Sequence, residues 1–154
     1  MRHSSSSNSQ APSMAFTLIS DIASLERSIA LWKQDTASDR RIAIDTEFIR
    51  ERTYAPVLEM VQVASPNGHI GLIDVPAIGN LTILWQFLDD PTLTKLVHAG
   101  NQDVEIMALA FGRPLNGPWF DTQVAGAFLG TGLQAGWGNR PAGSSRQAGQ
   151  RGRL

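Results

Sequence analysis

The spacing of hydrophobic and polar residues predicts strands and one helix in the first third of the chain. A short apolar strand at residues 15–20 is followed by apolar residues at helical spacing over residues 22–34. The polar segment 35–40 is expected to be a loop. Residues 41–48, "RIAIDTEF", form an apolar run and predict a strand that ends in acidic residues.

Two more strands are expected without a helix between them. Residues 57–65 alternate between two faces, and residues 69–75 form a second apolar run. The sequence "SPNG" between them is typical of a turn, so the two strands are predicted to form a hairpin. The alternation places Val57, Glu59, Val61 and Val63 on one face and Leu58, Met60, Gln62 and Ala64 on the other. Successive strands of this kind indicate an antiparallel part of a sheet.

In the second half, helical and extended patterns alternate. The pattern predicts helices over residues 80–90, 101–111 and 121–130, and extended segments over residues 94–100 and 117–120. Gly112 is expected to end the middle helix, and Asp121 to cap the last one. Alternating strands and helices favour parallel pairing. The whole pattern therefore predicts an α/β fold with a mixed sheet, antiparallel in its first strands, and flanking helices.

Composition divides the chain into a folded body and two polar ends. Residues 1–13 and 139–154 are predicted to be disordered tails, the second rich in Arg and Gly, and residues 14–138 to form the domain. The chain has no cysteine, which excludes disulfides and thiolate metal sites. No apolar run approaches the roughly 20 residues of a membrane helix, and no apolar secretory signal is present. We therefore expect a cytoplasmic protein that contacts no membrane.

The net charge of −1 hides an uneven distribution. The last fifteen residues hold four arginines and no acid, so the rest of the chain carries a net charge of about −5 by side-chain counting. An acidic body argues against an extended surface that follows nucleic-acid phosphates. It is compatible with a nucleic-acid enzyme in which bound cations supply the positive charge.

The strand at residues 41–48 carries two carboxylates, Asp45 and Glu47, on one face, because side chains alternate along a strand. Two neighbouring acids repel each other and are costly to desolvate, and a divalent cation offsets both effects. Carboxylate oxygens are ligands that Mg²⁺ and Mn²⁺ prefer. The ordinary alternative is a solvated strand end whose acids pair with Arg50 and Arg52.

A third acid, Asp103, lies near the start of a predicted helix that directly follows a strand. Its ordinary explanation is the favourable interaction of an acid with the positive end of a helix. In α/β sheets, however, the carboxyl ends of strands face a common crevice, so Asp103 is expected to approach Asp45 and Glu47 there. His98 ends the same strand, where a single histidine is more often a polar strand-end residue than a ligand.

These residues belong to an ordered series of motifs. "DTEF" is followed by the pattern TYxPxLxxxQ, then by HxxxxDxE, and then by FDTQxA. Over residues 16–138 the series resembles ribonuclease D, a member of the DEDD superfamily of 3′–5′ exonucleases. The resemblance implies a ribonuclease H-like fold and two-metal hydrolysis of phosphodiesters at RNA 3′ ends. It makes tRNA precursors the expected substrates, with DNA as an alternative.

The resemblance also implies roles for residues of this sequence. Asp45 would bridge two divalent cations, Mg²⁺ or Mn²⁺. Glu47 would bind one cation and help hold the attacking water, and Asp103 would bind the other. The residues expected to contact the substrate are Thr46, Phe48, Tyr54, His98 and Asn101. Asp121 is expected to be only a helix cap, and Gln62 to be a structural hydrogen-bonding group on its strand.

One motif of this family is missing. The family pattern continues with Tyr-x-x-x-Asp on a later helix, but the chain has one tyrosine, Tyr54, and no Asp or Glu after Asp121. The resemblance ends near Gly138, which we interpret as a frameshift or truncation that also removes helical domains that help bind RNA. The isolated chain is therefore expected to hydrolyse RNA weakly or not at all.

Two other functions stay open from the sequence. One is a non-catalytic remnant of an exonuclease fold that binds nucleotide or metal. The other is a different metal-dependent phosphohydrolase, which the ordered motifs disfavour. No protein partner is predicted.

Overall fold

A mixed sheet with helices packed on it makes up the part of the chain that the computed structural model describes, residues 16–50 and 56–130. The elements are β1 (Phe16–Ile19), α1 (Ile22–Asp39), β2 (Arg41–Ile49), β3 (Val57–Ala64), β4 (Ile70–Asp74), α2 (Val75–Ile78), α3 (Thr82–Leu88), β5 (Thr94–Val97), α4 (Asn101–Phe111), β6 (Trp119–Asp121) and α5 (Thr122–Phe128). The two predicted tails and Tyr54 lie outside the described residues.

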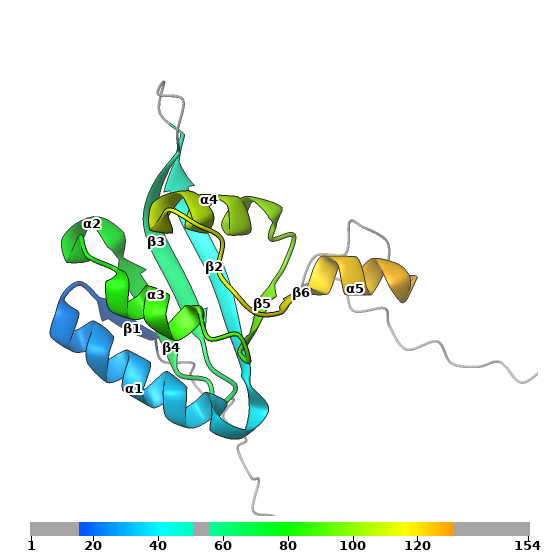
Figure 1. The fold of residues 1–154 in the computed structure, drawn as a ribbon, viewed down its shortest axis with the longest axis horizontal. Helices are drawn as coiled ribbons and strands as arrows, with labels where there is room; N and C mark the ends of the chain where they lie inside the picture. The colour runs from blue at the N-terminus through cyan, green and yellow to red at the C-terminus, as the bar shows by residue number, and fades with distance from the viewer. Residues whose placement is uncertain (1–15, 51–55, 131–154) are drawn as a thin grey trace, which may run out of the picture.

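The strands follow the order β1-β4-β3-β2-β5-β6 across the sheet (Figure 1). β2, β3 and β4 pair antiparallel, which confirms the predicted hairpin and the antiparallel first strands. β5 runs parallel to β2, and β6 runs parallel to β5, as the alternating second half predicts. β1 pairs parallel with β4. Because β2 and β5 are parallel neighbours, their carboxyl ends lie at the same edge of the sheet, where the candidate acids lie.

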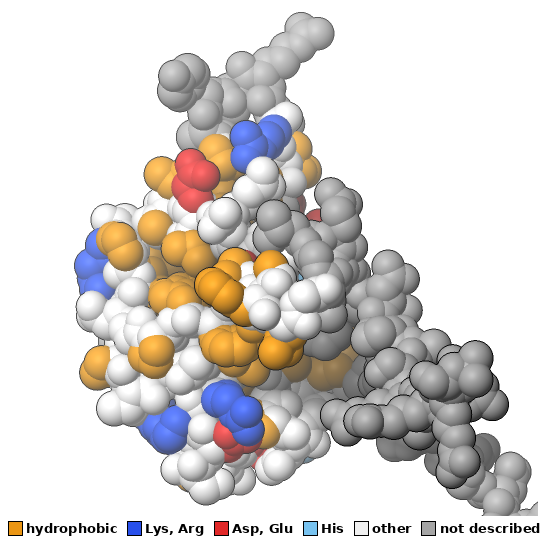
Figure 2. Space-filling model, turned by 90° about the vertical axis from the view of Figure 1, so that its right-hand side faces the viewer, with side chains coloured by type: hydrophobic (Ala, Val, Ile, Leu, Met, Phe, Trp, Pro, Cys, Tyr) orange, Lys and Arg blue, Asp and Glu red, His pale blue; other side chains and the backbone are white. Residues whose placement is uncertain are grey.

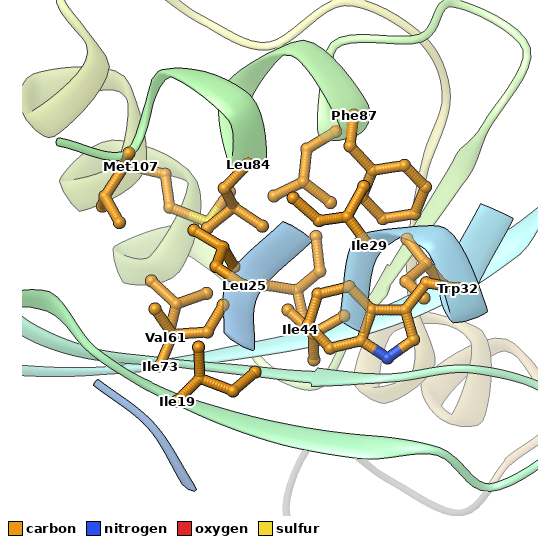
Figure 3. Close-up of a cluster of buried hydrophobic side chains, with 14 of the residues drawn as sticks. Ile19, Leu25, Ile29, Trp32, Ile44, Val61, Ile73, Leu84, Phe87 and Met107 are labelled. Atoms are coloured by element: carbon orange, nitrogen blue, oxygen red, sulfur yellow. The ribbon is translucent and has the colours of Figure 1, made fainter. Parts of the chain in front are cut away.

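The hydrophobic core lies between one face of the sheet and the helices α1, α3 and α4 (Figures 1 and 3). Trp32 of α1 is buried in it, stacks on Phe87 of α3 with ring centroids 6.1 Å apart, and donates its ring N–H to the carbonyl of His69 at 3.1 Å. Burying a large apolar side chain contributes roughly 1.5–3 kcal/mol. Figure 3 shows core side chains from both layers: Leu25, Ile29, Trp32, Leu84, Phe87 and Met107 from the helices, and Ile19, Ile44, Val61 and Ile73 from the strands.

The polar segment 35–40 is mostly helical, which corrects the predicted loop, because α1 continues to Asp39. Contacts from outside the helix stabilise its last turns. The Asp35 carboxylate is hydrogen-bonded to three side chains at the turn between β3 and β4, namely Ser65, Asn67 and His69. Ser65 lies 30 positions further along the chain, so local composition gives no sign of this contact.

A bulge in β3 corrects the predicted alternation of that strand. Glu47 of β2 pairs with Met60, but the next residue, Phe48, pairs with Leu58, so Glu59 is an extra residue on β3. Leu58 is therefore buried on the core side. Simple alternation placed Glu59 on that side instead.

Other boundaries differ from the predictions by a few residues. β5 ends at Val97, so residues 98–100 form a turn into α4 instead of a strand. The short helix α2 has no predicted counterpart, and the Asp74 carboxylate caps it by accepting a hydrogen bond from Ala77 N at 3.0 Å. None of the helices in the described ranges combines the length and the apolar character needed to cross a bilayer.

The last described helix, α5, lies outside the core. None of its residues is buried, and Phe128 is 89% exposed. Together with α4 and β6 it borders a mainly apolar cavity of about 660 Å³. Figure 2 shows the side of the molecule on which α5 lies, and hydrophobic side chains gather there.

Candidate functional site

The end of β2 presents two acids to solvent and the residue between them to the core. Thr46 is buried, whereas the side chains of Asp45 and Glu47 are exposed on the opposite face, as the alternation predicts. Gln62 is paired with Asp45 across the β2–β3 ladder, and its Nε2 donates to Asp45 Oδ2 at 3.2 Å. This bond agrees with the structural role predicted for Gln62.

Asp103 lies in the first turn of α4, faces β2 and is only 8% exposed. Its Oδ1 accepts hydrogen bonds from Thr46 N at 2.9 Å and from Thr46 Oγ1 at 2.6 Å. A buried carboxylate needs such donors, because burying it without them is costly. Pairing between β2 and β5 ends at Ala43, so the Thr46 N–H is available to α4 instead of to a strand.

The three predicted acids interact electrostatically. Burial raises the pKa of Asp45 above its usual value, and the carboxylates of Asp103 and Glu47 raise it further. However, no three Asp, Glu or His side chains within residues 16–50 and 56–130 lie close enough together to hold a metal ion. The acids are therefore neighbours without forming a finished metal centre, and their roles as metal ligands stay a prediction.

A cavity of about 510 Å³ opens beside Asp45. Its polar lining comes from Asp45, Gln62, His98 and Thr122, and the rest is mainly apolar. The Thr122 hydroxyl donates to Val97 O at 3.0 Å, so it accepts a hydrogen bond from His98 Nδ1 at 2.9 Å. This assigns the proton of a neutral His98 ring to Nδ1. The motif pattern gave no role to Thr122, because its contact with His98 arises only when β5 and β6 pair.

Asp121 caps α5 as predicted, but it also bonds the turn that precedes α4. Its Oδ1 accepts hydrogen bonds from Gln123 N at 2.8 Å and Val124 N at 3.4 Å. Its carboxylate accepts two more, from Ala99 N at 3.1 Å and Gly100 N at 3.0 Å. Burial raises the pKa of Asp121, but these backbone hydrogen bonds outweigh burial and leave the pKa below its usual value. The cap has a local sequence signal, and the contacts with Ala99 and Gly100 have none.

The other residues predicted to contact substrate do not all meet at this cavity. Phe48 packs partly against the core, and the Arg50 guanidinium lies over its ring, 5.5 Å from the centroid. Asn101 begins α4 and borders the apolar cavity next to α5 instead. Tyr54 lies outside the described residues. The structure thus brings His98 to the cavity beside Asp45, and it places Asn101 elsewhere.

Comparison with known proteins identifies the family. A family model described as 3′–5′ exonuclease matches residues 16–138. The chain belongs to the 3′–5′ exonuclease family. This result confirms the resemblance stated from the ordered motifs, and it covers the same range of residues.

This exonuclease-family chain is similar to ribonuclease D from several bacteria. It is 42% identical to ribonuclease D of Escherichia coli strain K12 over 97 residues, which are 63% of this chain and 25% of the relative. It is 36% identical to ribonuclease D of Shewanella sp. strain ANA-3 over 122 residues, or 79% of this chain and 30% of the relative. The chain thus spans less than a third of the length of these curated relatives.

Solved structures show the same fold. The crystal structure of Escherichia coli RNase D, an exoribonuclease involved in structured RNA processing, matches with a TM-score of 0.67 at 35% identity, over 80% of this chain and 31% of that one. The EXD2 exonuclease domain matches with a TM-score of 0.66 at 20% identity, over 75% of this chain and 60% of that one, which shows the fold alone. The predicted ribonuclease H-like fold of this exonuclease-family chain is confirmed.

Proposed function

We propose that this chain carries the site of a 3′–5′ exoribonuclease in which Asp45, Glu47 and Asp103 hold divalent cations. The contact of Asp103 with Thr46 carries the proposal, because it brings an acid of α4 to the strand that bears the other two. The family match supports hydrolysis at a 3′ end, and the similarity to ribonuclease D supports RNA as the substrate. tRNA precursors in the cytoplasm are the natural substrates we propose.

The chemistry of the three acids fits Mg²⁺ or Mn²⁺. They offer only carboxylate oxygens, which are the donors that these hard cations prefer. The raised pKa of Asp45, caused by burial and by the other two acids, reflects negative charge that a cation would offset. Both hydrogen bonds from Thr46 fall on Asp103 Oδ1, so Asp103 Oδ2 is the oxygen we propose for a cation. Bound cations would stabilise charge on the attacking and leaving oxygens.

The side chains around the acids would orient the reactants. Glu47 is exposed beside Asp45, where its carboxylate can accept a hydrogen bond from the attacking water. In the reaction, the water oxygen bonds to phosphorus while the bond from phosphorus to the 3′ oxygen of the shortened strand breaks. The products are a nucleoside 5′-monophosphate and that strand. The cavity lined by Gln62 and His98 would hold the terminal nucleotide next to Asp45.

We propose that hydrolysis by this chain is slow. The chain has no Asp or Glu after Asp121 and no Tyr-x-x-x-Asp motif, so a fourth acid and the tyrosine of the family pattern are missing from its sequence. A misplaced reacting group can cost on the order of 10²-fold in rate.

A Mn²⁺ titration of the full 154-residue chain tests the metal site. Asp45→Asn is compared with wild type, and Glu26→Gln, which changes an exposed acid on α1, serves as the control. Calorimetry should show an affinity for Asp45→Asn lower by about tenfold or more, and an unchanged affinity for Glu26→Gln. Equal affinities in all three proteins would overturn the metal site.

A separate assay addresses the substrate. 5′-labelled RNA and DNA of the same sequence are incubated with the chain and Mg²⁺ or Mn²⁺. We expect a slow, metal-dependent ladder of shortened RNA that Asp45→Asn abolishes. Faster shortening of the DNA would contradict the assignment of RNA. Mn²⁺ binding without shortening of either strand would favour the non-catalytic remnant.

A further inference from the structure

Asp121 accepts four backbone hydrogen bonds, two more than the capping of α5 requires. The additional donors are Ala99 N and Gly100 N, in the turn that joins β5 to α4. β6 pairs with β5 so that Asp121 lies opposite Val97, which places its carboxylate beside this turn. Asp121 therefore connects the start of α5 to the start of α4.

The turn bonded by Asp121 has a demanding backbone geometry. Ala99 has a left-handed conformation with φ of 56°, which is disfavoured for residues other than glycine. A Cβ at Gly100 would lie 2.4 Å from Val97 Cγ2, so the chain folds tightly back on the end of β5. Such a conformation persists only where surrounding groups fix it. The Asp121 carboxylate accepts hydrogen bonds from the N–H groups of Ala99 and Gly100 in this turn.

The same turn determines where α4 begins. Gly100 is the N-cap residue of α4, and its carbonyl accepts the hydrogen bond of Val104 N at 3.0 Å. Asp103 lies in the first turn of that helix, and its carboxylate binds Thr46. A displacement of Gly100 therefore shifts Asp103 relative to β2. Asp45, which belongs to β2 itself, keeps its place.

We propose that Asp121 is a positioning residue for Asp103: through the turn at Ala99 and Gly100, it fixes the start of α4 and so the approach of the Asp103 carboxylate to the acids of β2. The consequence for metal binding rests on the proposed function. The positioning itself rests on the hydrogen bonds from Asp121 to the turn and from Thr46 to Asp103.

Asp121→Asn separates this role from helix capping. Asparagine caps helices as well as aspartate does, and its oxygen in the place of Oδ1 can still accept from Ala99 N and Gln123 N. Its NH₂ group then takes the place of Oδ2 and faces the N–H of Gly100, which loses its acceptor. Asp21→Asn is the matched control, because Asp21 caps α1 through Ser24 N at 2.8 Å.

The readout is the ¹H–¹⁵N spectrum of the full chain, in which the Thr46 amide reports the position of the Asp103 carboxylate. We expect Asp121→Asn to shift the Thr46 signal and to speed its hydrogen exchange, while Asp21→Asn leaves both unchanged. The Mn²⁺ affinity of Asp121→Asn should fall by about tenfold or more, as for other groups that orient metal ligands. Should Asp121→Asn unfold, Ala99→Gly added to it relieves the left-handed backbone and leaves the same hydrogen bond missing.

Two results would overturn the positioning role. One is a Thr46 signal and exchange rate unchanged in Asp121→Asn, with changes confined to the amides of α5. The other is an equal shift of the Thr46 signal in Asp21→Asn. If the wild-type chain binds no Mn²⁺, the proposed function fails, while the Thr46 amide still decides whether Asp121 positions Asp103.

Discussion

Replacing Thr46 with valine removes one of the two hydrogen bonds to Asp103 Oδ1 and keeps the other. The Thr46 hydroxyl donates to this oxygen at 2.6 Å, and the backbone N–H, which donates at 2.9 Å, is unaffected by the substitution. Valine has nearly the same shape and the same branching at Cβ, so it can occupy the buried site without new contacts. The variant therefore tests how strongly a hydroxyl holds a buried carboxylate at the start of α4.

Hydrogen bonds to charged groups contribute roughly 1.5–3 kcal/mol. Because Asp103 keeps one donor, we expect Thr46→Val to lower the free energy of unfolding by about 2 kcal/mol, within that range. Thr36→Val is the matched control. Thr36 is also buried, but its hydroxyl donates to a neutral acceptor, the carbonyl of Trp32, at 2.7 Å. A neutral bond of this kind contributes only about 0.5–1.5 kcal/mol.

Urea unfolding followed by circular dichroism measures both variants, with the free energy taken by linear extrapolation. Thr46→Val should lose more stability than Thr36→Val at pH 7. An equal or larger loss for Thr36→Val would show that the charge of Asp103 adds nothing to its hydrogen bond with the hydroxyl, and the reasoning would fail.

Two further substitutions test other contacts. Hydrogen bonds from Arg113 and Asn116 lower the pKa of Asp89 to about 2 from the usual 3.8. Since the folded pKa lies below the unfolded one, this contribution to stability is complete above about pH 4 and is lost as the pH falls towards 2. The urea midpoint of Asp89→Asn should thus lie below that of wild type at pH 6 and converge with it near pH 2, and a constant difference would refute this. Gly100→Ala places a Cβ 2.4 Å from Val97 Cγ2, so thermal melting should show a loss of about 1–3 kcal/mol, and an unchanged midpoint would contradict the tight turn.

Local sequence patterns were sufficient to predict the strand that carries Asp45 and Glu47 and the faces on which its side chains lie. Side chains alternate along β2, so the sequence predicts Thr46 inside and Asp45 and Glu47 outside without any knowledge of the sheet. The cap of α5 by Asp121 is also local, because its acceptor and its two donors lie within three residues. The antiparallel and parallel halves of the sheet follow from whether a helix separates successive strands.

Contacts between distant segments had no such signal. Thr46 and Asp103 are 57 positions apart, and no periodicity predicts that one donates both its N–H and its hydroxyl to the other. The prediction of where α1 ends was wrong for the same reason. Asp35 is held by residues at the β3–β4 turn, and local composition does not reveal these contacts. Glu59 was misplaced because a bulge changes which side chains share a face.

The double hydrogen bond on Asp103 has a practical consequence for inactive variants. Alanine at position 103 would delete the carboxylate and also leave the buried hydroxyl of Thr46 without its acceptor. A lower rate of hydrolysis in that variant would then have a second explanation, which is disorder at the start of α4. Asp45 lies on the exposed face, where the hydrogen bond from Gln62 Nε2 to its carboxylate is open to solvent. For tests of the proposed site, Asp45→Asn is therefore the better loss-of-function variant, and results from Asp103 variants require a parallel check of folding.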